Sequence, residues 1–151
     1  MDRYVYRPKY VHADLQKKHY CNWIKFLKKS ENWNNKQIED YQLKELRRIV
    51  QYAYENTKGY RRLYDSYGIT PESIRTIEDF RKLPFVTKEI MKDDLEGFSV
   101  NIRGRQYVTT GGSTGVPFGF YRDRVAFAKE LASKAFQYYR VGWREGDRQI
   151  I

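Results

Sequence analysis

Residues 109–117 are the stretch of this chain whose residue types could do chemistry. They form the sequence Thr-Thr-Gly-Gly-Ser-Thr-Gly-Val-Pro, in which the first seven positions hold three glycines and four hydroxyl residues. Glycine allows tight turns that aim backbone N–H groups at an anion, and serine and threonine hydroxyls add donors without bulk. This composition is suited to holding phosphate oxygens, so we expect a phosphate-binding loop here.

Two well-known nucleotide-binding motifs do not fit this stretch. A Walker A loop needs Gly-Lys-Ser/Thr at the start of a helix, whereas Gly115 is followed by Val116 and Pro117. A Gly-x-Gly-x-x-Gly fingerprint ahead of a helix is also missing. A flexible hairpin turn would favour glycine and small polar residues too, but it needs only a couple of them. The number of hydroxyl residues favours phosphate binding over a plain turn.

The flanking residues predict the elements that position the loop. Residues 106–110 and 118–121 are rich in β-branched or aromatic residues, which predicts a strand on each side. Asp123 is a suitable N-cap for a helix that should end at Gly142. One face of that helix carries apolar residues at helical spacing, namely Val125, Ala128, Ala132, Ala135 and Tyr139.

The first hundred residues predict mostly helices. A surface-facing helix is expected over 15–29, a polar connection over 30–36, and a short helix over 60–67 that ends at Gly68. A stronger helix, with apolar residues at Leu43, Leu46, Val50 and Ala53, should stop at Gly59. Further helix starts are expected at Thr70 before Pro71, at Thr76 with Asp79, and at Thr87 with Glu89.

Bulk composition sets outer limits on the function. The chain has 151 residues, a net charge of +10 and one cysteine, Cys21, so no intramolecular disulfide can form and a reducing cytoplasm fits best. No apolar run is long enough to span a bilayer. His12, His19 and Cys21 lack a fourth ligand and zinc-type spacing, so aromatic packing explains them better than a metal site. The basic residues are scattered rather than clustered, which favours solvated faces over nucleic-acid binding.

The loop also carries a family resemblance. Residues 110–117 match, at every position, the pattern Thr-Ser/Gly-Gly-Ser/Thr-Thr-Gly-x-Pro of the phosphate loop in the adenylate-forming superfamily. The segments 80–88, with its Phe-x-x-Leu-Pro…Thr-Lys pattern, 43–64 and 118–147 resemble the phenylacetate-CoA ligase family within it. The flanks are similar to the branch that includes coenzyme F390 synthetase and CapK-like proteins named for capsular polysaccharide synthesis.

The resemblance implies a fold and a reaction. The parent would have an α/β fold, with residues 1–42 as a helical extension and 43–151 as the beginning of the AMP-binding domain, so that this piece alone is mostly helical. A carboxylic acid and ATP, with Mg2+, would give an acyl-adenylate and pyrophosphate, and coenzyme A would then take the acyl group. The full-length parent could form a dimer.

The resemblance also assigns the site residues. Thr110, Ser113 and Thr114 would donate from their hydroxyls, Gly111, Gly112 and Gly115 from their backbones, and Pro117 would fix the exit into the next strand.

The sequence gives reasons to expect an incomplete enzyme. The family's acyl pocket, magnesium motif, ribose-binding aspartate and catalytic lysine would lie beyond residue 151, so no catalytic residue is assigned and the chain alone is expected to be inactive. After a turn at Gly146-Asp147, residues 148–151 look like the start of a buried strand without a partner. We expect unpaired strand edges and poor solubility or oligomers in isolation. The alternatives are a stand-alone remnant or interaction module, and a basic nucleic-acid-binding protein.

Overall fold

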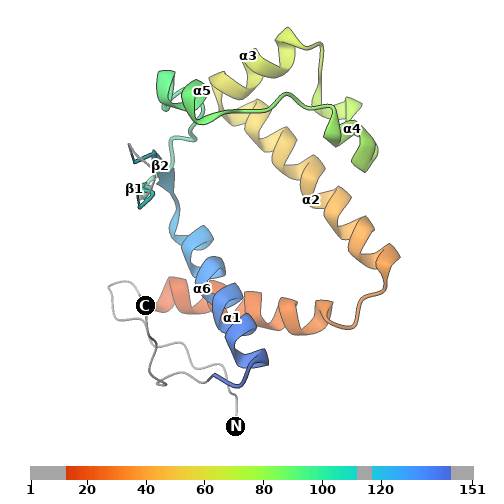
Figure 1. The fold of residues 1–151 in the computed structure, drawn as a ribbon, viewed down its shortest axis with the longest axis vertical. Coiled ribbons are helices and arrows are strands. Elements are labelled where there is room, and N and C mark those ends of the chain that lie inside the picture. Colours follow the sequence, from red (N-terminus) through yellow and green to blue (C-terminus); the bar gives the residue numbers. More distant parts are fainter. Residues whose placement is uncertain (1–12, 112–116, 144–151) are drawn as a thin grey trace. The chain divides into compact units, whose positions relative to one another are not determined.

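The structure, a computed structural model, describes residues 13–111 and 117–143 and contains two compact units. Unit 1 combines Met1–Trp33 with Arg122–Ile151, and unit 2 is Asn34–Tyr121. The elements are α1 (Ala13–Ser30), α2 (Asn35–Asn56), α3 (Lys58–Ser66), a 3-10 turn (Pro71–Ser73), α4 (Ile77–Arg81), α5 (Lys88–Asp93), β1 (Gln106–Thr109), β2 (Gly119–Arg122) and α6 (Arg124–Arg140) (Figure 1). The prediction of a mostly helical chain with a strand-loop-strand hairpin is confirmed, and the hairpin is antiparallel.

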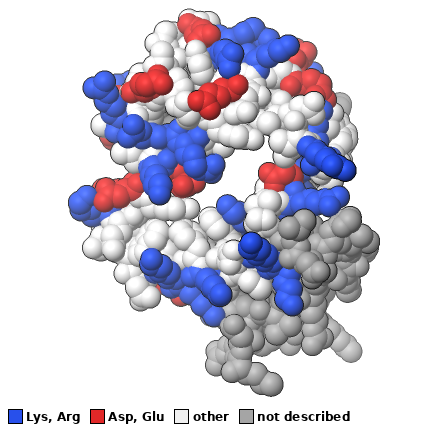
Figure 2. All heavy atoms as spheres, turned by 180° about the vertical axis from the view of Figure 1, so that it is seen from behind, with Lys and Arg blue, Asp and Glu red and all other residues white. Residues whose placement is uncertain are grey.

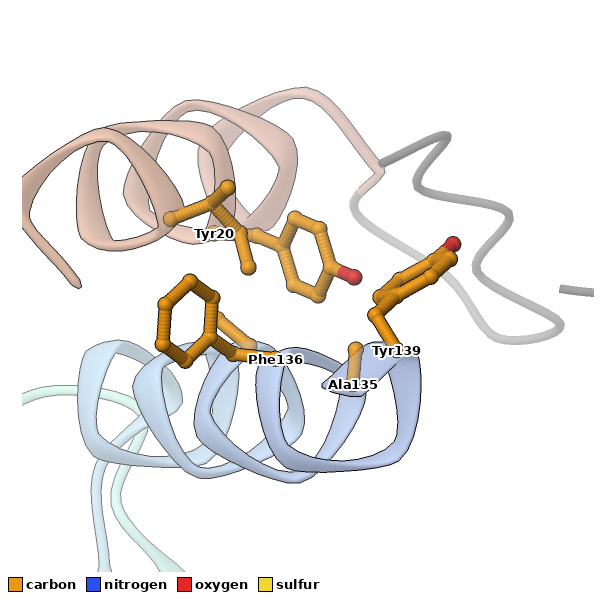
Figure 3. Packing of buried hydrophobic residues seen from close by; sticks show 6 residues of the cluster. Tyr20, Ala135, Phe136 and Tyr139 are labelled. Atoms are coloured by element: carbon orange, nitrogen blue, oxygen red, sulfur yellow. The ribbon is translucent and has the colours of Figure 1, made fainter. Parts of the chain in front are cut away.

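Unit 1 is held together by the packing of α1 against α6. Tyr20 and Ile24 of α1 are 2% and 3% exposed and lie against Ala132, Ala135 and Phe136 of α6 (Figure 3). The alanines leave room for the larger α1 side chains, so the two helices interlock as close-packed interiors do. The predicted alanine face of α6 is therefore confirmed as its buried face. The surface-facing interpretation of α1 is wrong for this side of the helix.

A polar contact fixes the same pair of helices at their edge. The indole Nε1 of Trp23 donates a hydrogen bond of 2.9 Å to Oγ of Ser133, and Lys129 Nζ lies 4.5 Å from the centroid of the Trp23 ring. Tryptophan commonly buries its ring while its N–H finds a partner. Trp23 therefore fixes the alignment of α1 and α6 as well as contributing apolar contact.

The core of unit 2 joins residues that are distant in sequence. Val50 of α2, Tyr64 of α3 and Ile74 after the 3-10 turn are 2%, 6% and 2% exposed and form one cluster. Phe80 and Leu83 pack against it from α4 and the segment after it. Burying such side chains contributes roughly 1.5–3 kcal/mol each relative to exposing them. The short α3 and α4 helices are thereby held on α2.

Thr57 makes the junction between α2 and α3. Its backbone N–H donates to the Ala53 carbonyl at 3.0 Å and its hydroxyl donates to the same oxygen at 2.8 Å, which ends α2. Its Oγ1 also accepts from the Tyr60 N–H at 3.3 Å, which begins α3. One threonine, with an extended backbone at φ −135° and ψ 137°, thus serves both helices.

The predicted helix stop at Gly59 is wrong. Gly59 lies in the first turn of α3, and its N–H donates to the Gly97 carbonyl at 2.7 Å. A Cβ at this position would lie 2.6–2.8 Å from ring atoms of Phe98. Glycine is needed here for a close tertiary approach and not for a left-handed turn, which is why the helix-stop pattern misled the prediction.

Most of the other predicted helix boundaries are confirmed. Thr76, Thr87 and Asp123 each accept a hydrogen bond from a backbone N–H three residues on, as N-caps do. Gly68 and Gly142 follow the ends of α3 and α6 with φ of 65° and 91°. Glycine adopts this left-handed conformation without the strain that a Cβ would add.

Two predicted boundaries are altered. Thr70 precedes Pro71 as expected, but its side chain makes no cap hydrogen bond and only a 3-10 turn follows. The polar connection predicted for 30–36 is shorter, because Asn34 forms a reciprocal capping box with Gln37 and α2 begins at Asn35.

Several predictions are left open by the structure. The turn at Gly146-Asp147 and the strand at 148–151 lie outside the described residues. The division at residues 42 and 43 stays a prediction, as does the α/β fold of a larger parent. No helix in the described ranges is long and apolar enough to cross a membrane.

We predict that Gly59→Ala destabilises unit 2. The added methyl would meet the Phe98 ring at 2.6–2.8 Å, and such overpacking costs about 1–3 kcal/mol. Urea unfolding followed by circular dichroism measures the change. Gly111→Ala is the matched control, because no atom lies within 4 Å of a Cβ built there and its φ lies outside the left-handed region. Equal unfolding midpoints for the two variants would contradict the close approach of Phe98.

A second prediction concerns the cap of α4. Hydrogen bonds from Lys82 and from Thr76 lower the pKa of Asp79 from 3.8 to about 2. Because the folded-state pKa is depressed, Asp79 stabilises the fold above about pH 4, and this stabilisation is lost as the pH falls toward 2. NMR titration of the Asp79 carboxyl should give the low value, and Lys82→Ala and Thr76→Val should each raise it. Titration near 3.8 in the unmodified protein would rule out the cap.

Candidate functional site

The predicted phosphate loop lies between β1 and β2 in unit 2. The structure describes Thr110, Gly111 and Pro117 at its two ends. The remaining predicted site residues, Gly112, Ser113, Thr114 and Gly115, lie outside the described residues. The structure therefore shows how the base of the loop is built.

Thr110 and Phe118 form that base. The Thr110 N–H donates to the Phe118 carbonyl at 2.9 Å, and the Phe118 N–H donates to Oγ1 of Thr110 at 3.0 Å. The threonine hydroxyl oxygen thus takes the place of a backbone carbonyl in the ladder. The hydroxyl hydrogen is not used in this bond, so Thr110 keeps the capacity to donate to an anion while it closes the hairpin.

Gly111 and Pro117 continue the loop from each side of this base, and both are exposed. No atom lies within 4 Å of a Cβ built on Gly111, and its φ is not in the left-handed region. Backbone conformation therefore does not require glycine at position 111, in contrast to Gly68 and Gly142, whose φ lies in the left-handed region. Its missing side chain leaves open space beside the loop base, where a ligand can approach the backbone.

The hairpin is attached to the rest of unit 2 by a cluster that the sequence analysis did not identify. Both oxygens of Glu96, in the turn after α5, accept hydrogen bonds. Oε1 accepts from the Tyr121 hydroxyl at 2.6 Å, and Oε2 accepts from Nη2 of Arg105 at 2.7 Å. Arg105 directly precedes β1 and Tyr121 belongs to β2. A single carboxylate therefore contacts both sides of the hairpin.

Ring contacts complete this cluster, which we define as Glu96, Arg105, Tyr107 and Tyr121. The Arg105 guanidinium carbon lies 3.8 Å from the centroid of the Tyr121 ring, an arrangement favourable for a cation over an aromatic face. The Tyr107 and Tyr121 rings meet edge to face at 5.6 Å. Tyr107 also covers Gly119, where a Cβ would collide with its hydroxyl.

The charges in the cluster alter two ionisation equilibria. The Tyr121 hydrogen bond and then the Arg105 guanidinium hold the pKa of Glu96 below its usual value. The pKa of Tyr121 is raised above 10.0, because its hydroxyl donates to the Glu96 carboxylate. Glu96 is therefore ionised and Tyr121 protonated at neutral pH, which is the combination that the hydrogen bonds require. No local sequence pattern links residues 96, 105 and 121, and Tyr121 reaches Glu96 only because the chain reverses between β1 and β2.

Unit 2 also contains an apolar cavity of about 630 Å3. It lies between α2, α3 and the segment from α4 to Val86. Its lining side chains are Ile49, Val50, Tyr52, Ala53, Thr57, Tyr60, Tyr64, Phe80, Arg81, Leu83, Pro84, Phe85, Val86, Phe98 and Val100. The volume is in the range of small-molecule pockets.

The chemistry of that cavity is limited. Phe85 is 91% exposed at its edge, and the Thr57 hydroxyl is already used at the α2–α3 junction. The Arg81 side chain is 73% exposed and lies 3.5 Å from Glu78. The described lining residues bring together no acid, base and nucleophile. The loop therefore remains the candidate site, because its residue types are suited to binding phosphate.

Surface charge does not single out another site. Figure 2 shows lysine and arginine side chains spread over the face in view, with acidic side chains among them mainly in its upper part. Several basic residues of the described ranges are paired locally, such as Lys36 with Asp40 at 2.9 Å and Lys134 with Glu130 at 2.7 Å. Exposed pairs of this kind contribute about 0–1 kcal/mol each. These pairs therefore mark no separate binding site.

Sequence comparison adds an independent observation. The chain is 32% identical over 111 residues to a phenylacetate-coenzyme A ligase of Thermus thermophilus, which covers 70% of the chain and 25% of the relative. It is 31% identical over 84 residues to that of Escherichia coli K12, with 54% and 19% covered, and 24% identical over 116 residues to that of Pseudomonas putida, with 74% and 26% covered.

The chain is similar to phenylacetate-coenzyme A ligases. The identity is low, and the chain spans only about a fifth to a quarter of the length of these curated relatives. No protein-family model matches the chain. The similarity supports a region related to acyl-CoA ligases.

We predict that Thr110→Val opens the loop base. Valine keeps the branched shape but has no oxygen to accept the Phe118 N–H, whose hydrogen bond of 3.0 Å is then lost. Such a bond contributes about 0.5–1.5 kcal/mol, so the Phe118 amide should exchange about three- to tenfold faster with deuterium. Thr110→Ser keeps the oxygen and is the control. Unchanged exchange in Thr110→Val would mean that the hydroxyl does not close the hairpin.

Proposed function

We propose that this chain supplies the ATP phosphate-binding loop of an acyl-adenylate-forming ligase. The observation that carries the proposal is the segment 110–117, which has the composition of a phosphate loop and is flanked by paired strands in a chain similar to phenylacetate-coenzyme A ligases. The closed base at Thr110 and Phe118 supports it, because a loop with fixed ends presents its donors with less ordering cost.

The loop would act on the leaving group of the first reaction. A carboxylate oxygen of the acid substrate attacks the α-phosphorus of ATP, the bond between the α-phosphorus and the bridging oxygen breaks, and pyrophosphate leaves. Hydroxyls of Thr110, Ser113 and Thr114 and backbone N–H groups of the glycines would donate to the β- and γ-phosphate oxygens. Donors placed where negative charge develops lower the barrier without reorganising during the step.

The other reactants of the proposed ligase are Mg2+, coenzyme A and the acid substrate. No three His, Cys, Asp or Glu side chains of the described residues gather as a metal site, so we derive no step through Mg2+ from this chain. Coenzyme A is the acyl acceptor in the proposed second step. The acid substrate stays open, because no acyl pocket is assigned in this chain.

The segments on both sides of the loop support a more specific placement of the parent protein. We place the parent in the coenzyme F390 synthetase and CapK-like branch of the family, with an α/β AMP-binding domain and a cytoplasmic location.

We predict that the double variant Ser113→Ala/Thr114→Ala weakens ATP binding. Each lost hydrogen bond to a charged phosphate is worth about 1.5–3 kcal/mol, so affinity should fall at least tenfold. Isothermal titration with ATP and Mg2+ measures it, with Thr70→Ala as the control because its side chain makes no cap hydrogen bond. Equal affinity in the double variant and in the unmodified protein would remove the loop from the binding site.

Titration with ATP and with an oligonucleotide distinguishes the alternative functions. Binding of a single-stranded oligonucleotide that falls steeply with salt would favour a nucleic-acid-binding protein. Absence of any ATP binding would favour a stand-alone remnant or interaction module.

A further inference from the structure

We propose that Glu96 is a positioning residue that holds the base of the loop in place. The inference rests on the proposed function for its connection to ATP, but the structural part of it concerns the hairpin alone. Glu96 lies 14 positions before Thr110 in the numbering and outside the loop pattern, so neither the motif nor the similarity to ligases assigns it a role.

The hairpin needs an external support. Its strands have four residues each, and every residue of the two strands is exposed or only partly buried. A two-stranded hairpin of this size is marginally stable by itself in water. Something outside the ladder must therefore fix where Thr110 and Phe118 lie.

Glu96 provides that support at the end of the hairpin opposite the loop. Its carboxylate accepts from Arg105 at 2.7 Å, just before β1, and from Tyr121 at 2.6 Å, in β2. Arg105 is also anchored, because its side chain is 19% exposed and its Nη1 donates to the Val100 carbonyl at 3.4 Å. The carboxylate thus connects Arg105, which precedes β1, with Tyr121, which lies within β2.

The cluster also specifies the register of the hairpin. The Tyr107 and Tyr121 rings are in contact, and Thr110 pairs with Phe118 three residues further along each strand. A slip by one residue would send Tyr121 to the opposite face and break its bond to Glu96. Holding this register therefore holds the start and end of the loop opposite each other.

The contribution of Glu96 should be local. Its side chain is 62% exposed, and exposed ion pairs add little to overall stability. The core of unit 2, formed by Val50, Tyr64 and Ile74, does not include the hairpin. Removing the carboxylate should loosen the hairpin while the rest of the unit unfolds as before, and this separates positioning from general stabilisation.

The test compares three variants in the full chain. Glu96→Ala removes both acceptors, Glu96→Gln keeps an oxygen for Tyr121 but loses the charge, and Glu39→Ala on the exposed surface of α2 is the matched control. Amide exchange at Thr110 and Phe118, the urea midpoint by circular dichroism, and affinity for ATP by titration are measured for each. Exchange reports on the hairpin whether or not ATP binds.

We expect Glu96→Ala to speed exchange at both amides about three- to tenfold and to weaken ATP binding by a similar factor, with an unchanged urea midpoint. Glu96→Gln should fall between Glu96→Ala and the unmodified chain, and Glu39→Ala should match the unmodified chain. Exchange in Glu96→Ala equal to that in Glu39→Ala would overturn the inference. So would faster exchange with unaltered ATP affinity, or a fall in the urea midpoint large enough to explain the exchange.

Failure of the proposed function has a different result. If the unmodified chain binds no ATP, the ligase proposal fails. Exchange at Thr110 and Phe118 then still decides whether Glu96 positions the hairpin.

Discussion

Thr110 and Phe118 are joined by two hydrogen bonds, one between backbone groups and one that uses the threonine hydroxyl oxygen. This pairing converts a glycine-rich segment into a loop with two fixed ends. The strands behind it are too short to be stable alone, so the pairing depends in turn on contacts outside the ladder. The carboxylate of Glu96 supplies them through its hydrogen bonds with Arg105 and Tyr121. The candidate site is thus a local motif held by tertiary contacts.

The helices of unit 2 are organised by hydroxyl and amide caps. Asn34, Thr57, Thr76 and Thr87 each accept a backbone N–H at the first turn of a helix. A cap satisfies donors that the helix itself leaves unpaired, which makes short helices such as α4 and α5 tolerable. For α4, packing of Phe80 on the cluster of Val50, Tyr64 and Ile74 then provides the free energy that a helix of this length lacks. Unit 1 is held together differently, because the small alanine side chains of α6 leave room for larger side chains of α1 such as Tyr20 (Figure 3).

The similarity to phenylacetate-coenzyme A ligases and the loop geometry support each other at different scales. The similarity extends over as much as 74% of the chain but over no more than 26% of the matched relatives. The geometry concerns a few residues. It explains why a threonine fits at position 110, because Oγ1 accepts from the Phe118 N–H in the hairpin while the hydroxyl hydrogen can donate to an anion. Together they support a region related to acyl-CoA ligases, and the proposed role of the loop is the chemical interpretation of that relation.

The sequence by itself determined most helix boundaries, because caps and left-handed glycines act within a few residues. Asp123, Thr87, Gly68 and Gly142 were predictable in this way, as were the two strands around the loop. Tertiary structure decided what depended on distant neighbours. Position 59 needs glycine because Phe98 covers it, Tyr20 is buried because α6 faces it, and Glu96 meets Tyr121 only after the chain reverses at the hairpin. Such contacts leave no periodic trace in the residues between them.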